Sequence, residues 1–249
     1  MALQVALLGD IHGNIVALEA VLTEVRRHKP ELIAITGDLV LNGPRPAEVV
    51  RRLRELEAEG DGAIVVQGNT DIAVTDFDYS AAFPWLDEIP AGHRAAAEWA
   101  HDQLADDELD YLRRLPAERR IRHEGAMLLV CHASPGSQTA GLPADLDPSV
   151  LTERVTRTDA DVIGCGHTHV AAIHEVGRRL ICNAGSCGYS FDNDPGASWA
   201  MVTLDPEGSS AELFRTPYEV QGVSDELSLR GLPGDIYRAA IVRTGRFVR

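Results

Sequence analysis

The chain has 249 residues, of which 45% are hydrophobic and 24% are charged, as in an ordinary globular protein. Its 38 acidic and 23 basic residues give a net charge of −15, which disfavours long nucleic acids and anionic lipids as partners. No apolar stretch approaches the ~18 residues that a membrane span needs. The chain begins MALQVALLGD, without a basic leader or a cleavage site, so we expect a cytoplasmic protein with no membrane contact.

Apolar runs and amphipathic spacing predict an α/β fold in the first part of the chain. Strands are predicted at 2–8, 32–35 and 63–66, and helices at 14–28 and 46–59. This alternation implies parallel strands that are joined by right-handed crossovers.

The later part of the chain is richer in strands. Residues 71–117 differ in composition, and we interpret them as an insertion beside the active site, with helices near 92–104 and 106–115. The tail from about residue 218 is expected to form a peripheral helix or an extended arm of a single domain, 1–249. Strands are predicted at 119–123, 126–131, 161–165, 170–176, 178–182, 198–204 and 210–215, and a helix near 147–157.

Neither the cysteines nor three of the histidines are expected to have a metal-binding or catalytic role. Cysteines occur at 131, 165, 182 and 187, each in or beside an apolar run, so we expect them to be buried rather than to bind metal or form disulfides. The histidines at 93, 101 and 174 are expected to be surface or rim residues.

Metal-ligating residue types follow five of the predicted strands. Loops at the carboxyl ends of such strands converge on ligand sites in α/β sheets. Asp10 and His12, like His167 and His169, are i, i+2 pairs, which point to the same side of an extended backbone. Carboxylate and imidazole together suit Mn²⁺, Fe²⁺ or Zn²⁺. The candidate ligands are Asp10, His12, Asp38, Asn69, His132, His167 and His169.

Five ordered motifs carry a resemblance to a known family. They are GDIHG (9–13), GDLVLNGP (37–44), GNTD (68–71), CHASP (131–135) and GHTH (166–169). In this order they resemble the motifs of the calcineurin-like metallophosphoesterases. The resemblance runs from residue 2 to about residue 204 and includes NAGSCG (183–188). It implies a two-sheet β sandwich flanked by helices, with metals at one edge.

The resemblance also implies how two divalent metal ions would be held. Asp10, His12, Asp38 and His169 would bind the first ion, and Asp38, Asn69, His132 and His167 the second, so that Asp38 bridges. Mn²⁺ is the preferred ion, with Fe, Zn, Ni or Co as alternatives. A hydroxide held between the ions would attack phosphorus. Asn14 is expected either to orient a metal ligand or to cap its helix.

Two positions depart from the family pattern. The family usually has histidine after the asparagine of the motif that reads GNTD here, where that histidine assists the substrate or the leaving group, but in this chain the residue is Thr70, followed by Asp71. Threonine has no pKa near neutrality, so the usual proton donor is missing. Some bacterial and archaeal phosphodiesterase branches of the family also have a small residue in place of this histidine. Asp71 is expected either to supply the proton or to form a surface hydrogen bond. Asn42 stands where protein serine/threonine phosphatases have arginine. Arg45 is a candidate phosphate contact, but an exposed loop arginine is the favoured interpretation.

The predicted function is hydrolysis of phosphodiesters in small or nucleotide-type substrates. Asp38, Asn69, Thr70 and Asp71 are the candidate catalytic residues, and Asn69 and Arg45 are the candidate substrate-binding residues. The alternatives are a dinucleoside polyphosphate hydrolase, a protein phosphatase, and a protein-binding scaffold of the same fold, as in a retromer subunit that has lost its metal ligands. The intact ligand set favours an enzyme over a scaffold.

Overall fold

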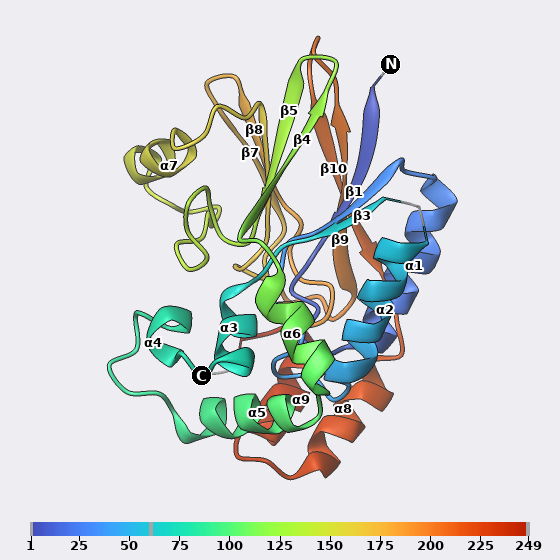
Figure 1. Cartoon of the computed structure of the whole chain (residues 1–249), viewed down its shortest axis with the longest axis vertical. Helices are drawn as coiled ribbons and strands as arrows, with labels where there is room; N and C mark the ends of the chain where they lie inside the picture. The colour runs from blue at the N-terminus through green and yellow to red at the C-terminus, as the bar shows by residue number, and fades with distance from the viewer. Residues whose placement is uncertain (1, 60–61, 248–249) are drawn as a thin grey trace.

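The computed structural model describes residues 2–59 and 62–247, which form two five-stranded mixed sheets packed face to face (Figure 1). The first sheet has the order β10-β9-β1-β2-β3 and the second has the order β4-β5-β6-β8-β7. The strands are β1 (Leu3–Leu8), β2 (Leu32–Ile35), β3 (Ala63–Val65), β4 (Glu118–His123), β5 (Ala126–Cys131), β6 (Val162–Cys165), β7 (Ala172–Val176), β8 (Arg179–Asn183), β9 (Ala197–Leu204) and β10 (Ser210–Thr216). The two-sheet sandwich expected from the resemblance is confirmed.

Parallel strands lie at the centre of each sheet. β1 pairs in parallel with β2, and β2 with β3, while β9 joins β1 in the antiparallel direction. In the second sheet β5, β6 and β8 are parallel neighbours, and the antiparallel β4 and β7 form the edges. The carboxyl ends of the central strands therefore face the same end of the sandwich.

Helices cover the sheets and extend beyond that end. They are α1 (Ile15–His28), α2 (Pro46–Ala58), α3 (Asn69–Thr75), α4 (Tyr79–Ala82), α5 (Ala91–Asp102), α6 (Asp106–Arg114), α7 (Pro148–Val155), α8 (Val220–Arg230) and α9 (Asp235–Thr244). In Figure 1, α1 and α2 cover the first sheet, α7 lies beside the second, and α3 to α6, α8 and α9 lie below the sheets. Among the described residues, none of the helices is both long and apolar enough to cross a membrane.

Side-chain alternation along β1 divides the core into two layers. Val5 and Leu7 point into the space between the sheets, where they pack with residues of both sheets, including Leu128 and Val202. Leu8 lies on the opposite face of the sheet, in the cluster that α1 and α2 complete. This period of two is the one expected of a strand that is buried on both faces.

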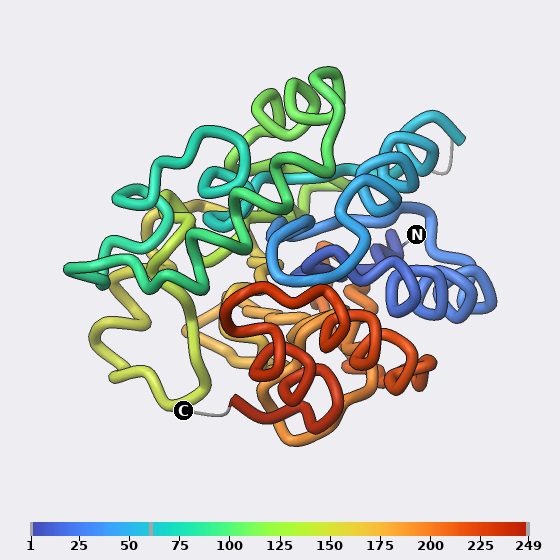
Figure 2. Tube along the Cα trace, turned by 90° about the horizontal axis from the view of Figure 1, so that it is seen from below, coloured from blue at the N-terminus to red at the C-terminus, as the bar shows by residue number. Residues whose placement is uncertain are grey.

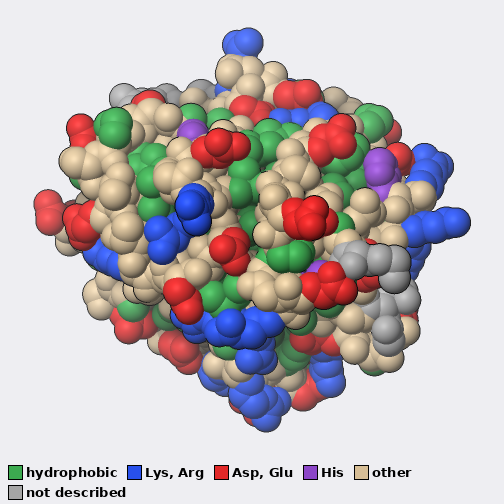
Figure 3. Space-filling model, turned by 90° about the horizontal axis from the view of Figure 1, so that it is seen from above, with side chains coloured by type: hydrophobic (Ala, Val, Ile, Leu, Met, Phe, Trp, Pro, Cys, Tyr) green, Lys and Arg blue, Asp and Glu red, His purple; other side chains and the backbone are tan. Residues whose placement is uncertain are grey.

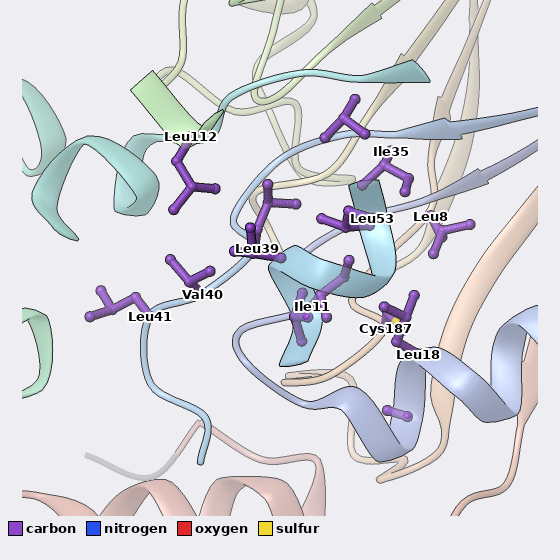
Figure 4. Packing of buried hydrophobic residues seen from close by; sticks show 14 of the residues in the cluster. Leu8, Ile11, Leu18, Ile35, Leu39, Val40, Leu41, Leu53, Leu112 and Cys187 are labelled. Carbon is purple, nitrogen blue, oxygen red and sulfur yellow. The ribbon is translucent and has the colours of Figure 1, made fainter. Parts of the chain in front are cut away.

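The loop after β2 is anchored by the same outer cluster. Leu39, Val40 and Leu41 are each at most 1% exposed and belong to the same cluster as Leu18 of α1 and Leu53 of α2. In Figure 4, Leu39 lies nearest to α2, and Val40 and Leu41 lie farther along the loop. Because these three residues follow Asp38 directly, their burial fixes the backbone that carries it.

Most predicted elements occur within one or two residues of their expected bounds, and the four cysteines are buried as expected. Helix α3 was not predicted. It begins after a three-residue connection from β3, and the Asp71 carboxylate accepts a hydrogen bond from the backbone N–H of Gly68 at 2.9 Å. This is one half of a capping box, a helix-start signal that is present in the sequence G-N-T-D.

The end of the molecule farthest from α8 and α9 carries mixed charge. In the view from above, acidic and basic side chains are interspersed over the strand ends (Figure 3). Helices α8 and α9 lie at the other end of the molecule, side by side with the 75–115 segment when the chain is seen from below (Figure 2).

Candidate metal centre

All seven candidate ligands lie at the carboxyl ends of the strands that were expected to carry them. Asp10 and His12 follow β1, Asp38 follows β2, and Asn69 begins α3 after a three-residue connection from β3. His132 follows β5, while His167 and His169 follow β6. Six of the seven are at most 6% exposed, and His167 is half-buried: the six are Asp10, His12, Asp38, Asn69, His132 and His169.

The ligand atoms form two groups that share Asp38. In the first group, His169 Nε2 lies 3.2 Å from His12 Nε2 and 3.3 Å from an oxygen of Asp10. His12 Nε2 lies 3.6 Å from the Asp38 Oδ2 atom.

In the second group, the Asp38 Oδ1 atom lies 3.3 Å from His132 Nε2. The Asn69 Oδ1 atom lies 2.8 Å from His132 Nε2 and 3.0 Å from His167 Nδ1. Donor atoms bound ~2.0–2.2 Å from one ion stand roughly 3.0–3.5 Å apart, so both groups have the spacing of metal ligands.

Backbone carbonyls orient three of the four rings. The Nδ1–H groups of His12, His132 and His169 donate to the carbonyl oxygens of Leu41, Thr36 and Tyr189, respectively. This arrangement leaves the Nε2 lone pair of each ring directed into the site, as in histidines that bind metals.

The charge states of His12, His167 and Asp38 suit a divalent cation. Burial and the neighbouring His169 lower the pKa of His12 to about 4, and burial and His132 lower that of His167 to about 4. Both rings are therefore neutral at pH 7 and can donate a lone pair. Burial alone would raise the pKa of Asp38, but His132, His12 and His167 lower it to about 2, so Asp38 is ionised. The buried Asp10 Oδ1 atom has no hydrogen-bond partner among the described residues, so a cation would satisfy it.

The backbone conformation of the i, i+2 pairs differs from the extended conformation that the sequence predicted. Asp10 and His12 both have φ of 50°, and His167 and His169 have φ of 68° and 59°. These residues therefore lie in left-handed turns rather than on extended backbone. Such φ values are uncommon outside glycine and cost ~1–3 kcal/mol each when the surroundings hold them. The two pairs also differ in how they contribute to the ligand groups. Asp10 and His12 belong to one group, whereas His167 and His169 belong to different groups.

Turns that contain small or polar residues let the ligand loops pack closely against one another. A Cβ atom on Gly166 would lie 2.2 Å from the Asp10 Oδ2 atom. Ser186, within the 183–188 turn, donates to the Asp10 carbonyl oxygen at 2.7 Å, and Asn183 donates to the Gly166 carbonyl oxygen at 2.8 Å. This turn therefore supports the backbone of both the first and the last ligand loops.

Asp71 is buried, and its carboxylate binds backbone N–H groups; it lies neither on the surface nor in the cavity. It is 0% exposed, and it accepts hydrogen bonds from the backbone N–H groups of Asp38, Leu39 and Gly68 at 3.1, 2.8 and 2.9 Å. Burial and the Asp38 charge raise the pKa of Asp71 to about 7. Because both carboxylate oxygens face these three N–H groups, the expectation that Asp71 donates a proton to the leaving group has no geometric support.

Arg45 is a partly exposed loop arginine, which agrees with the favoured interpretation and not with the phosphate contact. Its guanidinium pairs with Glu226 of α8 at 3.0 Å and does not line the cavity beside the metal centre, so phosphate contact by Arg45 has no geometric support. Asn14 is the N-cap of α1, where its Oδ1 atom accepts from Ala17 N at 3.1 Å. Its Nδ2 group donates to the Gly188 carbonyl and to Tyr218, so the capping role accounts for it.

Thr70 and Asn69 lie in the site as expected. The Thr70 N–H donates to the Asp38 Oδ1 atom at 2.9 Å, and its buried hydroxyl has no hydrogen-bond partner among the described residues. The Nδ2 group of Asn69 donates to the Ala82 carbonyl oxygen at 2.9 Å, which turns its Oδ1 atom toward His132.

A cavity of about 450 Å³ opens directly over the metal centre. Its lining includes residues of the 71–117 segment and of the chain after residue 218. The tail is therefore not peripheral, because α8 and α9 form a hairpin whose second helix borders the cavity. His93, expected to be an ordinary surface or rim residue, lines it too. The lining residues outside the ligand groups include Phe83, Trp85, His93, Tyr189, Phe191, Tyr237, Arg238 and Phe247.

Two buried arginines attach this hairpin to the loop after Asp38. Arg238 donates from Nε to the Asn42 Oδ1 atom at 3.1 Å, and Arg230 donates to the Gly43 carbonyl oxygen at 3.0 Å. Both guanidinium groups pair with Asp235, which is 2% exposed. None of these residues was predicted to be functional, since an arginine in a helix usually faces solvent.

The comparison with known proteins agrees with the fold and the ligand set. The model of the calcineurin-like phosphoesterase superfamily domain matches residues 3–207. The chain belongs to the calcineurin-like phosphoesterase superfamily. It is therefore a metal-dependent phosphoesterase, with a buried Asp/His cluster suited to divalent metal ions.

Several relatives of this phosphoesterase match it over more than nine-tenths of its length. A metallophosphoesterase from Sphaerobacter thermophilus is 26% identical, with a TM-score of 0.74 over 98% of this chain and 100% of that one. A hypothetical protein from Pyrococcus horikoshii shares the fold, with 21% identity and a TM-score of 0.83 over 99% and 100% of the two chains. An uncharacterised protein of Methanocaldococcus jannaschii is 23% identical over 92% of this chain and 93% of its own length.

A further relative has a named activity. The symmetrical bis(5'-nucleosyl)-tetraphosphatase of Paracidovorax citrulli is 34% identical over 51% of this chain, and the match spans 42% of that protein. The family model ends at residue 207, so the α8–α9 hairpin lies outside the matched part of the phosphoesterase.

The two ligand groups predict different effects for two neighbouring histidines. His169→Ala should empty mainly the position beside Asp10 and His12, because its Nε2 atom lies among their ligand atoms. His167→Ala should empty mainly the position beside Asn69 and His132. Anomalous diffraction from Mn²⁺-soaked crystals of both variants measures the two occupancies separately. Identical loss of metal in the two variants would contradict the assignment.

Proposed function

We propose that this phosphoesterase hydrolyses phosphodiester bonds in small or nucleotide-type esters, with two divalent transition-metal ions at the Asp38 groups. The observation that carries the proposal is that two groups of candidate ligands share one carboxylate. A carboxylate placed between two groups is the arrangement that holds ions close enough to act on one phosphate. The cytoplasmic location expected from the sequence belongs to the same proposal.

The donor set supports Mn²⁺ as the preferred ion, with Fe, Zn, Ni or Co as alternatives. All donors are nitrogen or oxygen atoms, and no cysteine lies among them. When bound by these residues, divalent ions would polarise phosphoryl oxygens and lower the pKa of water. Within a chain of net charge −15, the site would then carry a local positive charge, which would favour an anionic ester there.

The protein's own groups position the ligands. Asp38 is held by Asp71 and the Thr70 N–H, and the histidine rings are held by backbone carbonyls. Such supporting hydrogen bonds fix the ligand geometry and typically affect metal affinity or activity ~10–100-fold. The walls around the cavity exclude part of the bulk water from the reacting phosphate.

Hydrolysis of dinucleoside polyphosphates is the second candidate. It is favoured by the relative named symmetrical bis(5'-nucleosyl)-tetraphosphatase, although that similarity covers about half of this chain. A protein phosphatase is less favoured, because Asn42 stands in the place of the arginine and its side chain is engaged by Arg238.

A substrate panel tests the proposal. The purified chain, loaded with Mn²⁺, is assayed with nucleoside and alkyl phosphodiesters, matched monoesters, and a diadenosine tetraphosphate. We expect the diesters to have the highest kcat/KM. Preferential cleavage of the tetraphosphate would establish the second candidate instead, and preferential cleavage of monoesters would overturn both.

The threonine at position 70 predicts a strong dependence on the leaving group. General acid catalysis is typically worth ~10²–10⁴-fold, and Thr70 has no pKa near neutrality. Nitrophenyl diesters should therefore react much faster than alkyl diesters. Thr70→His should accelerate the poor leaving groups more than the good ones.

The measurement is the rate as a function of leaving-group pKa. Thr70→Val serves as the control, because it keeps the shape of the side chain without its hydroxyl. His93→Gln tests a histidine of the cavity wall that lies outside the ligand groups. A shallow dependence in the native protein that Thr70→His leaves unchanged would contradict the interpretation of Thr70 as a missing acid.

A further inference from the structure

The cavity over the metal centre is walled by aromatic rings from segments far apart in the chain. Phe83 and Trp85 come from the connection between α4 and α5, and Tyr237 and Phe247 come from α9 and the residues after it. Phe191 lies in the loop between β8 and β9. In Figure 2 the 75–115 segment and the C-terminal hairpin lie side by side at this end of the molecule.

The rings adjoin both ligand groups. Phe191 stacks on His169, with ring centroids 4.3 Å apart and an angle of 18° between the planes, and Phe247 meets Phe191 edge-on at 5.1 Å. On the side of the second group, Trp85 meets His167 edge-on at 6.0 Å. A phosphate at the ligand groups would therefore have aromatic surface on either side of it.

Two of these rings are only partly covered by the protein. Trp85 is 55% exposed and Phe247 is 57% exposed, although both line the cavity. Large exposed aromatic groups at the edge of a cavity are typical of ligand sites, because their burial is completed when the ligand binds.

The walls are held in place before any ligand binds. The Arg238 guanidinium donates to the carbonyl oxygens of Gly92 and Pro233 and to the Asn42 side chain. It thus links the 71–117 segment, the α8–α9 connection and the loop after Asp38. A cavity that is already formed loses little entropy on binding.

We propose that this aromatic cavity binds the nucleobase of the substrate while the ester phosphate lies at the metal centre. The inference rests on the proposed function and narrows it to nucleoside esters. Flat aromatic rings bind to such side chains by stacking, and they do so with little dependence on base identity. Aromatic side chains dominate the apolar lining, where Ile241 is the one residue with a branched aliphatic side chain in the described part of the cavity.

Polar groups in the cavity favour a base over an alkyl chain. Thr70 and His93 line the same cavity, and the Thr70 hydroxyl is buried without a partner in the described part of the chain. A heteroaromatic edge offers hydrogen-bonding atoms to such groups, whereas an alkyl chain would leave them unsatisfied.

A binding experiment without phosphate separates this inference from hydrolysis. Adenosine and ribose are titrated against the full chain, and binding is followed by ligand-observed NMR. We expect adenosine to bind and ribose not to bind. Trp85→Ala and Phe247→Ala should each weaken adenosine binding about 10-fold to 100-fold. Trp85→Phe and Phe247→Tyr should largely restore it, because they keep an aromatic face.

Leu229→Ala is the matched control. Leu229 is 85% exposed on α8 and does not line the cavity, so its truncation should leave adenosine binding unchanged. Equal weakening by Leu229→Ala, or unchanged binding in both aromatic variants, would overturn the inference.

Kinetics on matched diesters give the second readout. The methyl ester of AMP and the methyl ester of ribose 5-phosphate differ only in the base. We expect the base to lower KM, and Trp85→Ala to raise KM for the AMP ester with little change for the ribose ester. An octyl phosphodiester with a lower KM than the AMP ester would show an alkyl site and overturn the inference. Adenosine binding without turnover of any ester would refute the proposed function and leave the aromatic site standing.

Discussion

Asp38→Asn should reduce phosphoesterase activity by ~10³-fold or more and weaken metal binding in both ligand groups. Asp38 is the carboxylate that belongs to both groups, with its Oδ1 atom 3.3 Å from His132 and its Oδ2 atom 3.6 Å from His12. The substitution removes a negative charge from between two cation positions. Loss of even one stabilising group in an active site typically costs ~10²–10³-fold in rate.

Elemental analysis and activity with added Mn²⁺ check this prediction. Asp107→Asn is the matched control, because the Asp107 side chain is 67% exposed and pairs with Arg54 on the surface. It should keep native metal content and activity. An Asp38→Asn variant that retains full metal content and turnover would refute the shared role of Asp38.

Gly166→Ala should reduce metal affinity at the Asp10 position and activity by ~10²-fold, although it adds only a methyl group. The new Cβ atom would lie 2.2 Å from the Asp10 Oδ2 atom and 2.8 Å from the Thr36 hydroxyl. That same Asp10 oxygen accepts a hydrogen bond from the His167 backbone at 2.9 Å. Asp10 must therefore shift, and a displacement of ~1 Å in an active site can cost ~10²-fold.

The control for this substitution is Gly222→Ala in α8. A Cβ atom there would meet only the Glu219 side chain, at 3.6 Å, and alanine favours the helix. Thermal unfolding distinguishes loss of the site from loss of the fold. A Gly166→Ala variant with native metal affinity would contradict the prediction, because it would show that the loop accommodates the methyl group without moving Asp10.

The local sequence carried enough information to identify the ligands. Each candidate follows an apolar strand, and the structure places all seven at the same end of the sandwich. Strand periodicity and turn residues are local properties, so they can be recognised without knowing the partners of each strand. The order of the five motifs then pointed to the family, which the match over residues 3–207 confirms.

The roles of Asp71 and Arg45 could not be inferred in the same way. An acidic residue beside a metal ligand has the same local sequence whether it faces substrate or backbone. The burial of Asp71 against the N–H groups of Asp38 and Leu39 depends on how β2 and β3 lie beside each other. Arg45 turns to Glu226, a residue 181 positions away, because α8 packs over that loop.

The amino-acid sequence by itself determined which side chains could bind metal and which strands present them, because both follow from residue type and short-range periodicity. Only the tertiary structure decided how these ligands divide into two groups around Asp38, since the left-handed turns at Asp10 and His167 depend on the contacts that hold them. It also decided that the chain after residue 218 closes the cavity. Tyr237 and Phe247 read locally as helix-core or tail residues, and the packing of the hairpin on the 71–117 segment places them beside the metal centre.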